Sequence, residues 1–207
     1  MFTEQNQIIK AGELLPGMSA ISQEPVWLIA LDQALENTGI AILSTGKGII
    51  YTSVLKTNKN HIIENRLAYI DRVIEELIRE LDPIDIAMEE VYPGLAGRTV
   101  SILSQVYCTI TNICHRVDKK FKIYSSSKLR RGSWVKKLDL EGTKAYCRKW
   151  LVEDLGEEQI KDLEDHETDA IGILWAMALD KGARKDNIKY MNIQKTPFDQ
   201  LKLLRKL

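Results

Sequence analysis

Four side chains of the kinds that bind metal ions stand at comparable points along the chain. Asp32 and Glu89 each end a short apolar run, of the kind that forms a buried strand. His166 and Asp169 lie three residues apart where a long apolar segment begins, so a helix there would carry both on one face. Three carboxylates and an imidazole suit hard, oxygen-preferring cations such as Mg²⁺ or Mn²⁺.

Two such cations about 4 Å apart can clamp a phosphodiester, activate the attacking water and stabilise the leaving oxygen. Each residue also has a structural explanation of its own. An Asp after a strand can open a turn, and acids such as Asp165, Glu167 and Asp169 are stabilised at a helix N-terminus by the helix dipole. Their recurrence at two strand ends and one helix start favours a shared site, because such ends can converge on one crevice of a mixed sheet.

The charged residues are unevenly distributed, although Lys plus Arg and Asp plus Glu balance at 29 each. Residues 119–149 hold eleven basic and two acidic residues, whereas residues 151–170 hold nine acidic and one basic. Residues 181–207 are again basic, with eight Lys or Arg against two Asp. Two basic zones around an acidic one suggest a polyanionic partner and a cation site in one molecule. Ordinary solvated helix faces would give the same composition.

The cysteines and the hydropathy indicate where in the cell the protein is expected. Cys108, Cys114 and Cys147 form no zinc-binding spacing and indicate free thiols in a reducing environment. The chain opens with no signal peptide, and no apolar run approaches the roughly 18 residues of a membrane span. We therefore expect a cytoplasmic protein that does not bind membranes.

The hydrophobic pattern predicts one mixed α/β domain at residues 26–181, between an N-terminal arm at 1–25 and a basic C-terminal extension at 182–207. Strands are predicted at about 26–31, 39–43, 48–54, 84–88 and 121–124, and helices at about 60–80, 97–117, 142–155 and 165–179. Short connections make the first three strands antiparallel, and helical crossovers make the last two parallel. The result is a mixed five-stranded sheet with helices on both faces.

The chain resembles the RuvC branch of Holliday junction resolvases, within the ribonuclease H-like nuclease superfamily. In that family a strand ends in Asp-Pro-Gly with Thr-Gly several residues later, and here Asp32 is followed by Thr38-Gly39. The family's fourth strand ends Ala-Ile-Glu-Gln-Val-Phe, where this chain has Ala87-Met-Glu89-Glu-Val-Tyr92. Its final helix carries Asp or His and then Asp, as in His166-Glu-Thr-Asp169. The resemblance spans residues about 26–180 and indicates a divergent member encoded by a phage or a bacterium.

The resemblance implies the ribonuclease H-like fold and a catalytic tetrad of metal ligands. The tetrad is Asp32, Glu89, His166 and Asp169, which would hold Mg²⁺, with Mn²⁺ as a substitute. Asp165, beside His166, is the rival ligand.

The resemblance also implies residues that contact DNA. Tyr92 falls where the family has an aromatic that meets unstacked junction bases, although a core aromatic at a helix start would look the same. Arg98 belongs to the loop after it, which would touch DNA. Basic residues near the scissile phosphate would be Lys128, Arg130, Arg131 and Lys144, the last of them at the catalytic centre.

The activity that the resemblance implies is that of a crossover junction endodeoxyribonuclease. Such an enzyme cuts Holliday junctions, and other branched DNA, by paired phosphodiester hydrolysis that leaves 5′-phosphate ends. Paired cuts need two active sites and hence a homodimer. The apolar stripe of the second predicted helix, Val100 to Val117, is a candidate dimer face, or else part of the core.

One departure and several alternatives remain open. Gln33-Ala34 stands where the family has Pro-Gly, which leaves the turn less constrained. A ribonuclease H-like enzyme acting on RNA or RNA–DNA hybrid would carry the same residues. A non-catalytic branched-DNA-binding module would be expected to have lost the tetrad, which is intact. A sugar-kinase or actin-like ATPase would need a Gly-rich second phosphate loop, which this chain lacks.

Overall fold

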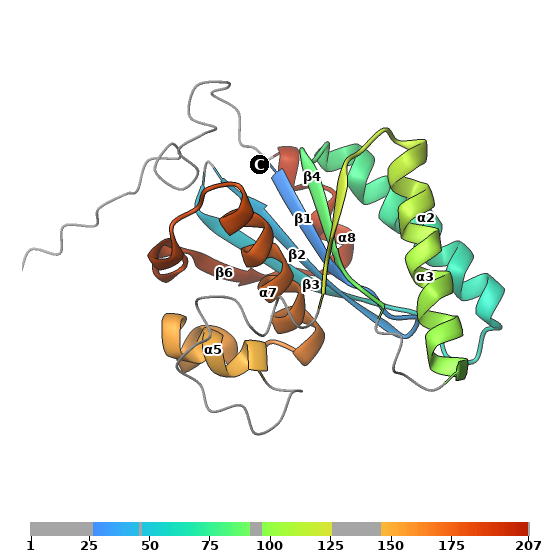
Figure 1. The fold of residues 1–207 in the computed structure, drawn as a ribbon, viewed down its shortest axis with the longest axis horizontal. Coiled ribbons are helices and arrows are strands. Elements are labelled where there is room, and N and C mark those ends of the chain that lie inside the picture. Colours follow the sequence, from blue (N-terminus) through green and yellow to red (C-terminus); the bar gives the residue numbers. More distant parts are fainter. Residues whose placement is uncertain (1–26, 46, 92–96, 126–145, 207) are drawn as a thin grey trace, which may run out of the picture.

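The computed structural model describes residues 27–45, 47–91, 97–125 and 146–206. The predicted N-terminal arm lies outside them. In the described part of the chain one mixed sheet runs in the strand order β5-β4-β1-β2-β3-β6 (Figure 1). The strands are β1 (Trp27–Asp32), β2 (Asn37–Ser44), β3 (Ile49–Lys56), β4 (Asp85–Glu89), β5 (Phe121–Tyr124) and β6 (Asn192–Lys195).

The strand pairing confirms the predicted mixed sheet and adds one strand to it. β1, β2 and β3 form an antiparallel meander, and β4 and β5 follow parallel to β1. The prediction of five strands is wrong by one, because β6 pairs in parallel with β3, with Ile193 beside Ile50. β6 comes from the segment predicted as a basic extension. Its four residues include one apolar side chain, which leaves no periodic signal.

The longer helices lie where their spacing predicts them. They are α2 (Ile63–Leu81), α3 (Gly97–Arg116), α5 (Tyr146–Leu155) and α7 (Asp165–Asp180); shorter ones are α6 (Glu157–Ile160), η2 (Lys185–Tyr190), α8 (Phe198–Leu201) and η3 (Leu204–Lys206). The first residues of the helix predicted at 142–155 lie outside the described residues. α2 ends at Asp82, which turns left-handed at φ 50° and donates its N–H to the Ile78 carbonyl before Pro83 stops the helix.

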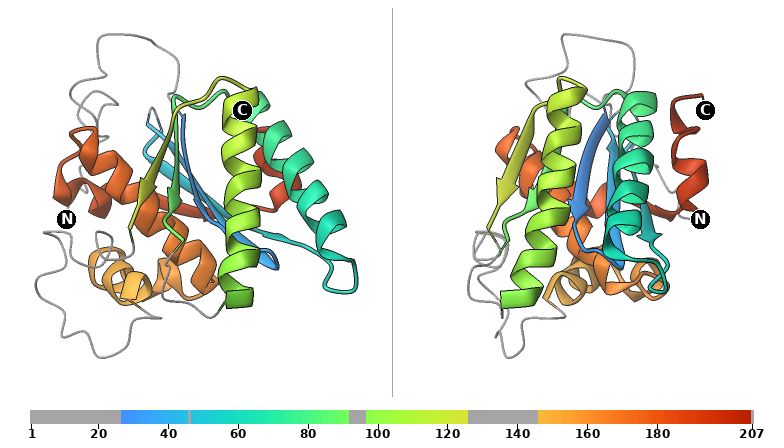
Figure 2. Two further views of the ribbon diagram at one scale, coloured as in Figure 1. Left: turned by 45° about the vertical axis from the view of Figure 1, so that its right-hand side comes forward. Right: turned by 90° about the vertical axis from the view of Figure 1, so that its right-hand side faces the viewer.

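The helices cover both faces of the sheet. α2 and α3 lie side by side on one face, and α7 crosses the other (Figure 2). β1 serves both layers, since Ile29 and Leu31 pack toward α2 and α3 while Leu28 and Ala30 pack toward α7. Burying each large apolar side chain contributes about 1.5–3 kcal/mol, so a strand buried on both faces holds the two layers together. None of the helices in the described ranges is long and apolar enough to cross a membrane.

Candidate active site

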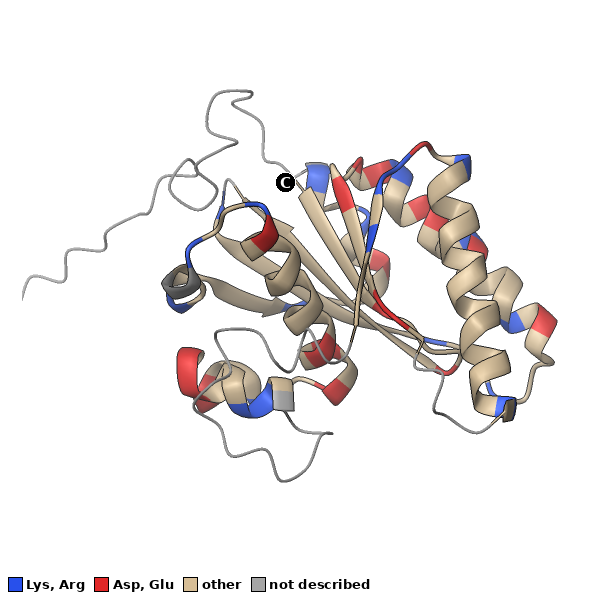
Figure 3. Cartoon of the chain, viewed as in Figure 1, with Lys and Arg blue, Asp and Glu red and all other residues tan. Residues whose placement is uncertain are grey.

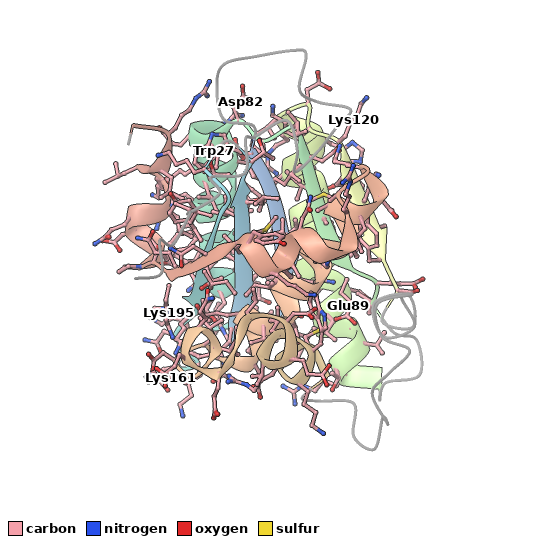
Figure 4. All side chains as sticks on the ribbon, turned by 90° about the vertical axis from the view of Figure 1, so that its left-hand side faces the viewer. Trp27, Asp82, Glu89, Lys120, Lys161 and Lys195 are labelled. Carbon is pink, nitrogen blue, oxygen red and sulfur yellow. The ribbon has the colours of Figure 1, made fainter. Side chains whose placement is uncertain are left out.

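Two predicted carboxylates lie side by side at one end of the sheet. Asp32 is the last residue of β1 and Glu89 the last of β4. The two strands run parallel with Leu31 opposite Met88, so each carboxylate is one residue beyond that pair. Glu89 therefore lies at the opposite end of the sheet from Trp27, the first residue of β1 (Figure 4).

The start of α7 meets these strand ends. The Nδ1 of His166 is 2.6 Å from the Oδ2 of Asp32, a contact between residues 134 apart in the chain. Asp169 follows three residues later on the same helix. The acidic first turn of α7 and the acidic end of β4 are red in Figure 3. Three elements thus bring Asp32, Glu89, His166 and Asp169 to the same end of the sheet.

Gly39 allows α7 to lie close to β2. It lies on β2 opposite Asp32. A Cβ atom on Gly39 would lie 1.9 Å from the backbone oxygen of His166, far inside any allowed contact. The glycine of the Thr-Gly motif is therefore required because the backbone of α7 packs directly on the backbone of β2.

The electrostatics show an excess of negative charge. Burial, and then the neighbouring charge of Asp32, raise the pKa of Asp169 to about 7, with a smaller contribution from Glu89. The hydrogen bond to Asp32 raises the pKa of His166 above its usual value. Both shifts favour the protonated forms of these residues.

Cys147 on α5 is a partner of Asp169 that the sequence does not indicate. Its thiol donates a hydrogen bond to the Asp169 carboxylate, which lowers the pKa of that carboxyl. Burial, and then the charge of Asp169, raise the pKa of the thiol well above its usual value, so the group stays protonated. Gly172 makes room for this contact, since a Cβ there would lie 2.7 Å from the Cys147 sulfur.

The turn after Asp32 is fixed by side-chain hydrogen bonds where the family has Pro-Gly. The buried amide of Gln33 accepts from the Glu89 N–H at 3.2 Å and donates to the Glu89 carbonyl. The Thr38 hydroxyl donates to the Ala34 carbonyl at 2.7 Å. These contacts constrain the turn and join it to the end of β4.

The donor types suit a hard divalent cation, and the raised pKa of Asp169 marks negative charge that a cation would neutralise. The side chains as they stand do not enclose an ion: within the described ranges, no three His, Cys, Asp or Glu side chains are grouped closely enough to hold one. Asp32 instead bonds to His166. Cation binding would therefore replace the hydrogen bond between these two residues.

The other predicted site residues that the structure describes are exposed. Asp165, the rival of His166, is exposed, and its Oδ1 accepts a hydrogen bond from Arg148 Nε at 3.2 Å. The residue that contacts Asp32 is His166. Arg98 is exposed in the first turn of α3. The other predicted contacts lie outside the described residues: Tyr92, Lys128, Arg130, Arg131 and Lys144.

No protein-family model matches the chain. The crossover junction endodeoxyribonuclease RuvC of Orientia tsutsugamushi (strain Ikeda) is 26% identical over 107 residues, which cover 50% of this chain and 67% of that protein. Among solved structures, Thermus thermophilus RuvC in complex with Holliday junction substrate has a TM-score of 0.57 at 13% identity, over 74% of this chain and 92% of that one.

The yeast mitochondrial Holliday junction resolvase Ydc2 has a TM-score of 0.52 at 12% identity, over 87% of this chain and 88% of that one. These structural similarities establish the fold, which is ribonuclease H-like. In sequence and in fold, the chain is thus similar to the RuvC-type Holliday junction resolvases, which are crossover junction endodeoxyribonucleases.

Proposed function

We propose that the chain is a divalent-metal-dependent, structure-selective endonuclease that resolves Holliday junctions by paired phosphodiester hydrolysis, leaving 5′-phosphate ends. One observation carries the proposal, the meeting of β1, β4 and α7. There Asp32 contacts His166 at 2.6 Å, and burial beside Asp32 and Glu89 raises the pKa of Asp169 to about 7. A carboxyl whose pKa is perturbed in this way by neighbouring carboxylates is typical of catalytic centres.

The proposed metal ligands are Asp32, Glu89, His166 and Asp169. A bound Mg²⁺ or Mn²⁺ would supply charge neutralisation and an activated water for attack on the phosphodiester. The chain's own groups prepare that site. Cys147 orients the Asp169 carboxylate, and before a cation binds, the Nδ1 of His166 hydrogen-bonds Asp32.

The proposed substrate is a four-way DNA junction, the substrate named for the Thermus thermophilus complex. Two symmetric cuts require two active sites, so we propose a homodimer. α3 is the candidate dimer face at its first half, where Leu103 is half-buried, because Val106, Ile110 and Ile113 further along pack into the core. The predicted cations Lys128, Arg130, Arg131 and Lys144, with Arg98 and Tyr92, remain the proposed DNA contacts.

A cleavage assay tests the proposal. Purified protein is incubated with labelled four-way junction, duplex, flap and RNA–DNA hybrid, in Mg²⁺, Mn²⁺ or EDTA. We expect symmetric junction cuts in Mg²⁺ and Mn²⁺ and none in EDTA. Asp32→Asn and Asp169→Asn should each lower the rate by about 10³-fold or more. Asp165→Asn is the matched control, since that carboxylate is exposed and pairs with Arg148.

Each contrary outcome points to a different error. Cleavage of hybrid alone would replace the junction proposal with a ribonuclease H-like activity on RNA. Junction binding without cleavage in any metal would indicate a branched-DNA-binding module. Full activity in Asp169→Asn would overturn the proposed tetrad while leaving the nuclease activity intact.

A further inference from the structure

A basic groove lies between the end of β3 and the first turns of α2. Its volume is about 590 Å³, and it is open to solvent. Its lining includes the cationic side chains Lys56, Arg66 and Arg72, together with His61 and Tyr69. No acidic residue is among the described residues that line it. A concave surface with several cations and no carboxylate favours a polyanion.

Hydrogen bonds connect the floor of this groove to the candidate active site. Thr57 donates its backbone N–H to the Glu36 carbonyl at 3.0 Å and its hydroxyl to the Leu35 carbonyl at 2.6 Å. Both carbonyls belong to the turn that starts after Asp32. At the groove's edge, Lys56 Nζ pairs with Glu164 Oε1 at 2.7 Å, two residues before His166. The groove therefore borders the site on the side of β3.

Two guanidinium groups supply the groove's positive charge, since Lys56 is paired with a carboxylate. Arg66 donates from Nε to the Thr57 hydroxyl at 2.8 Å, a contact that orients its planar head without neutralising it. The head of Arg72 lies 5.7 Å from the centre of the exposed Tyr69 ring. Guanidinium groups bind phosphate oxygens in a forked geometry, and an aromatic ring beside them can pack on a sugar or a base.

We propose that this groove binds the sugar-phosphate backbone of the junction arm that leaves the catalytic end of the sheet. Arg66 and Arg72 contact successive phosphates, and Tyr69 packs against the intervening sugar. The groove fixes the direction in which that arm departs, and hence which phosphate reaches the tetrad. This inference rests on the proposed function.

The test compares Arg72→Gln with Arg79→Gln, both in an Asp32→Asn background without divalent metal. Arg79 lies on the same helix but outside the groove, where it pairs with Glu75 at 2.8 Å. The dissociation constant for a long-armed four-way junction is measured between 50 and 200 mM salt. Each lost phosphate contact should lower the slope of log Kd against log salt by about 1. We expect that reduction for Arg72→Gln and none for Arg79→Gln.

Arm length provides a second, independent measurement. The double variant Arg66→Gln/Arg72→Gln should lower the salt slope by about 2 in total. Junctions with progressively shortened arms should lose affinity for the protein with an intact groove, until its Kd equals that of the double variant. The affinity of the double variant should not change over the same range, because both contacts are already absent. Arg66→Gln also removes the hydrogen bond to the Thr57 hydroxyl. Thermal unfolding of each variant therefore checks that the fold is as stable as in the protein with no substitution.

Equal salt slopes for Arg72→Gln and Arg79→Gln, or an equal response of both to arm shortening, would overturn the groove as a DNA site. That result would leave the proposed function untouched, since cleavage is assayed separately with metal. Conversely, the proposed function fails if the protein with no substitution cuts no branched DNA. A slope difference that persisted in that case would still support the groove as a nucleic-acid site.

Discussion

The side-chain amide of Gln33 hydrogen-bonds both backbone polar groups of Glu89. The backbone pairing of β1 with β4 extends to Leu31 and Met88, so the amide continues the pairing of the two strands beyond that point through a side chain. It thereby fixes the end of β4, and with it the position of the Glu89 carboxylate, against the end of β1. A polar side chain thus constrains the turn at the position where the RuvC-type resolvases, which the chain resembles, have Pro-Gly.

Replacing Gln33 with Ala should separate the two strand ends. The Glu89 N–H and carbonyl would both lose a buried partner, at a cost of about 1–3 kcal/mol in the free energy of unfolding. Because Glu89 would lose its fixed position, we expect junction cleavage to fall by about 10-fold. Urea unfolding and single-turnover cleavage measure the two effects. Gln105→Ala, an exposed Gln on α3, is the matched control and should change neither. Unaltered cleavage by Gln33→Ala would show that the amide does not position Glu89.

Gly39→Ala should be among the most damaging single changes in the chain. The added Cβ would lie 1.9 Å from the His166 carbonyl oxygen, so α7 would have to move off β2. We expect a loss of at least about 3 kcal/mol in the free energy of unfolding, and loss of the contact between His166 and Asp32. Gly97→Ala is the control, because a Cβ at that position meets nothing within 4 Å. Thermal unfolding that was equal for the two variants would contradict the close packing of α7 on β2.

Most of the fold follows from local patterns. α2 is predicted because Ile70, Val73, Ile74 and Leu77 recur at helical spacing, and all four are among the residues that it buries. β6 is missed because a four-residue strand with one apolar side chain depends on its partner, β3, for its existence. Pairing between segments about 140 residues apart leaves no trace in the local sequence.

The site is predicted in part, for a related reason. Carboxylates at strand ends and a helix start are visible along the chain, and Asp32 and His166 do come together. The contacts that hold them are not visible. Cys147 bonds to Asp169 only because α5 packs on α7, and Gln33 bonds to Glu89 only because β4 lies beside β1. Such side-chain partners depend on tertiary packing, which cannot be predicted from the spacing of residues along the sequence.

The stability of the metal-free protein should fall as the pH rises. An unfolded chain releases the Asp169 proton near pH 4, whereas the folded chain holds it up to about pH 7. The free energy of unfolding should therefore decrease between these values, by at most about 4 kcal/mol. His166 acts in the same direction, because its raised pKa gives a stabilisation that is lost as the pH rises through that pKa. Urea unfolding in EDTA from pH 4.5 to 8.5 measures the slope.

Asp169→Asn should remove most of this pH dependence and make the metal-free protein more stable at pH 8. Asp165→Asn, which changes an exposed carboxylate, should leave the slope as it is. Added Mg²⁺ should raise the free energy of unfolding more at pH 8 than at pH 6, because the cation competes with the protons of Asp169 and His166. A Mg²⁺ effect that was independent of pH would argue against binding at these residues.

Lys195 on β6 should stabilise the start of α7. Its Nζ lies 3.1 Å from Oε2 of the fully buried Glu167 and donates to the Asp162 carbonyl at 2.7 Å. Among the described residues, none hydrogen-bonds the other oxygen of Glu167, so removing the lysine would leave a buried carboxylate poorly compensated. We expect Lys195→Met to lower the free energy of unfolding by about 1–3 kcal/mol, and to slow cleavage because Glu167 adjoins His166.

Lys161→Met is the control for this prediction. Lys161 also pairs with an acid, but on the exposed surface, where it contacts Glu158 three residues away (Figure 4). Such a pair contributes about 0–1 kcal/mol. Adding Glu167→Gln to Lys195→Met should recover part of the lost stability, since a neutral amide does not need the lysine. If Lys195→Met and Lys161→Met unfold alike, Lys195 does not stabilise α7, and the start of that helix is held by its other contacts, among them those with Gly39 and Asp32.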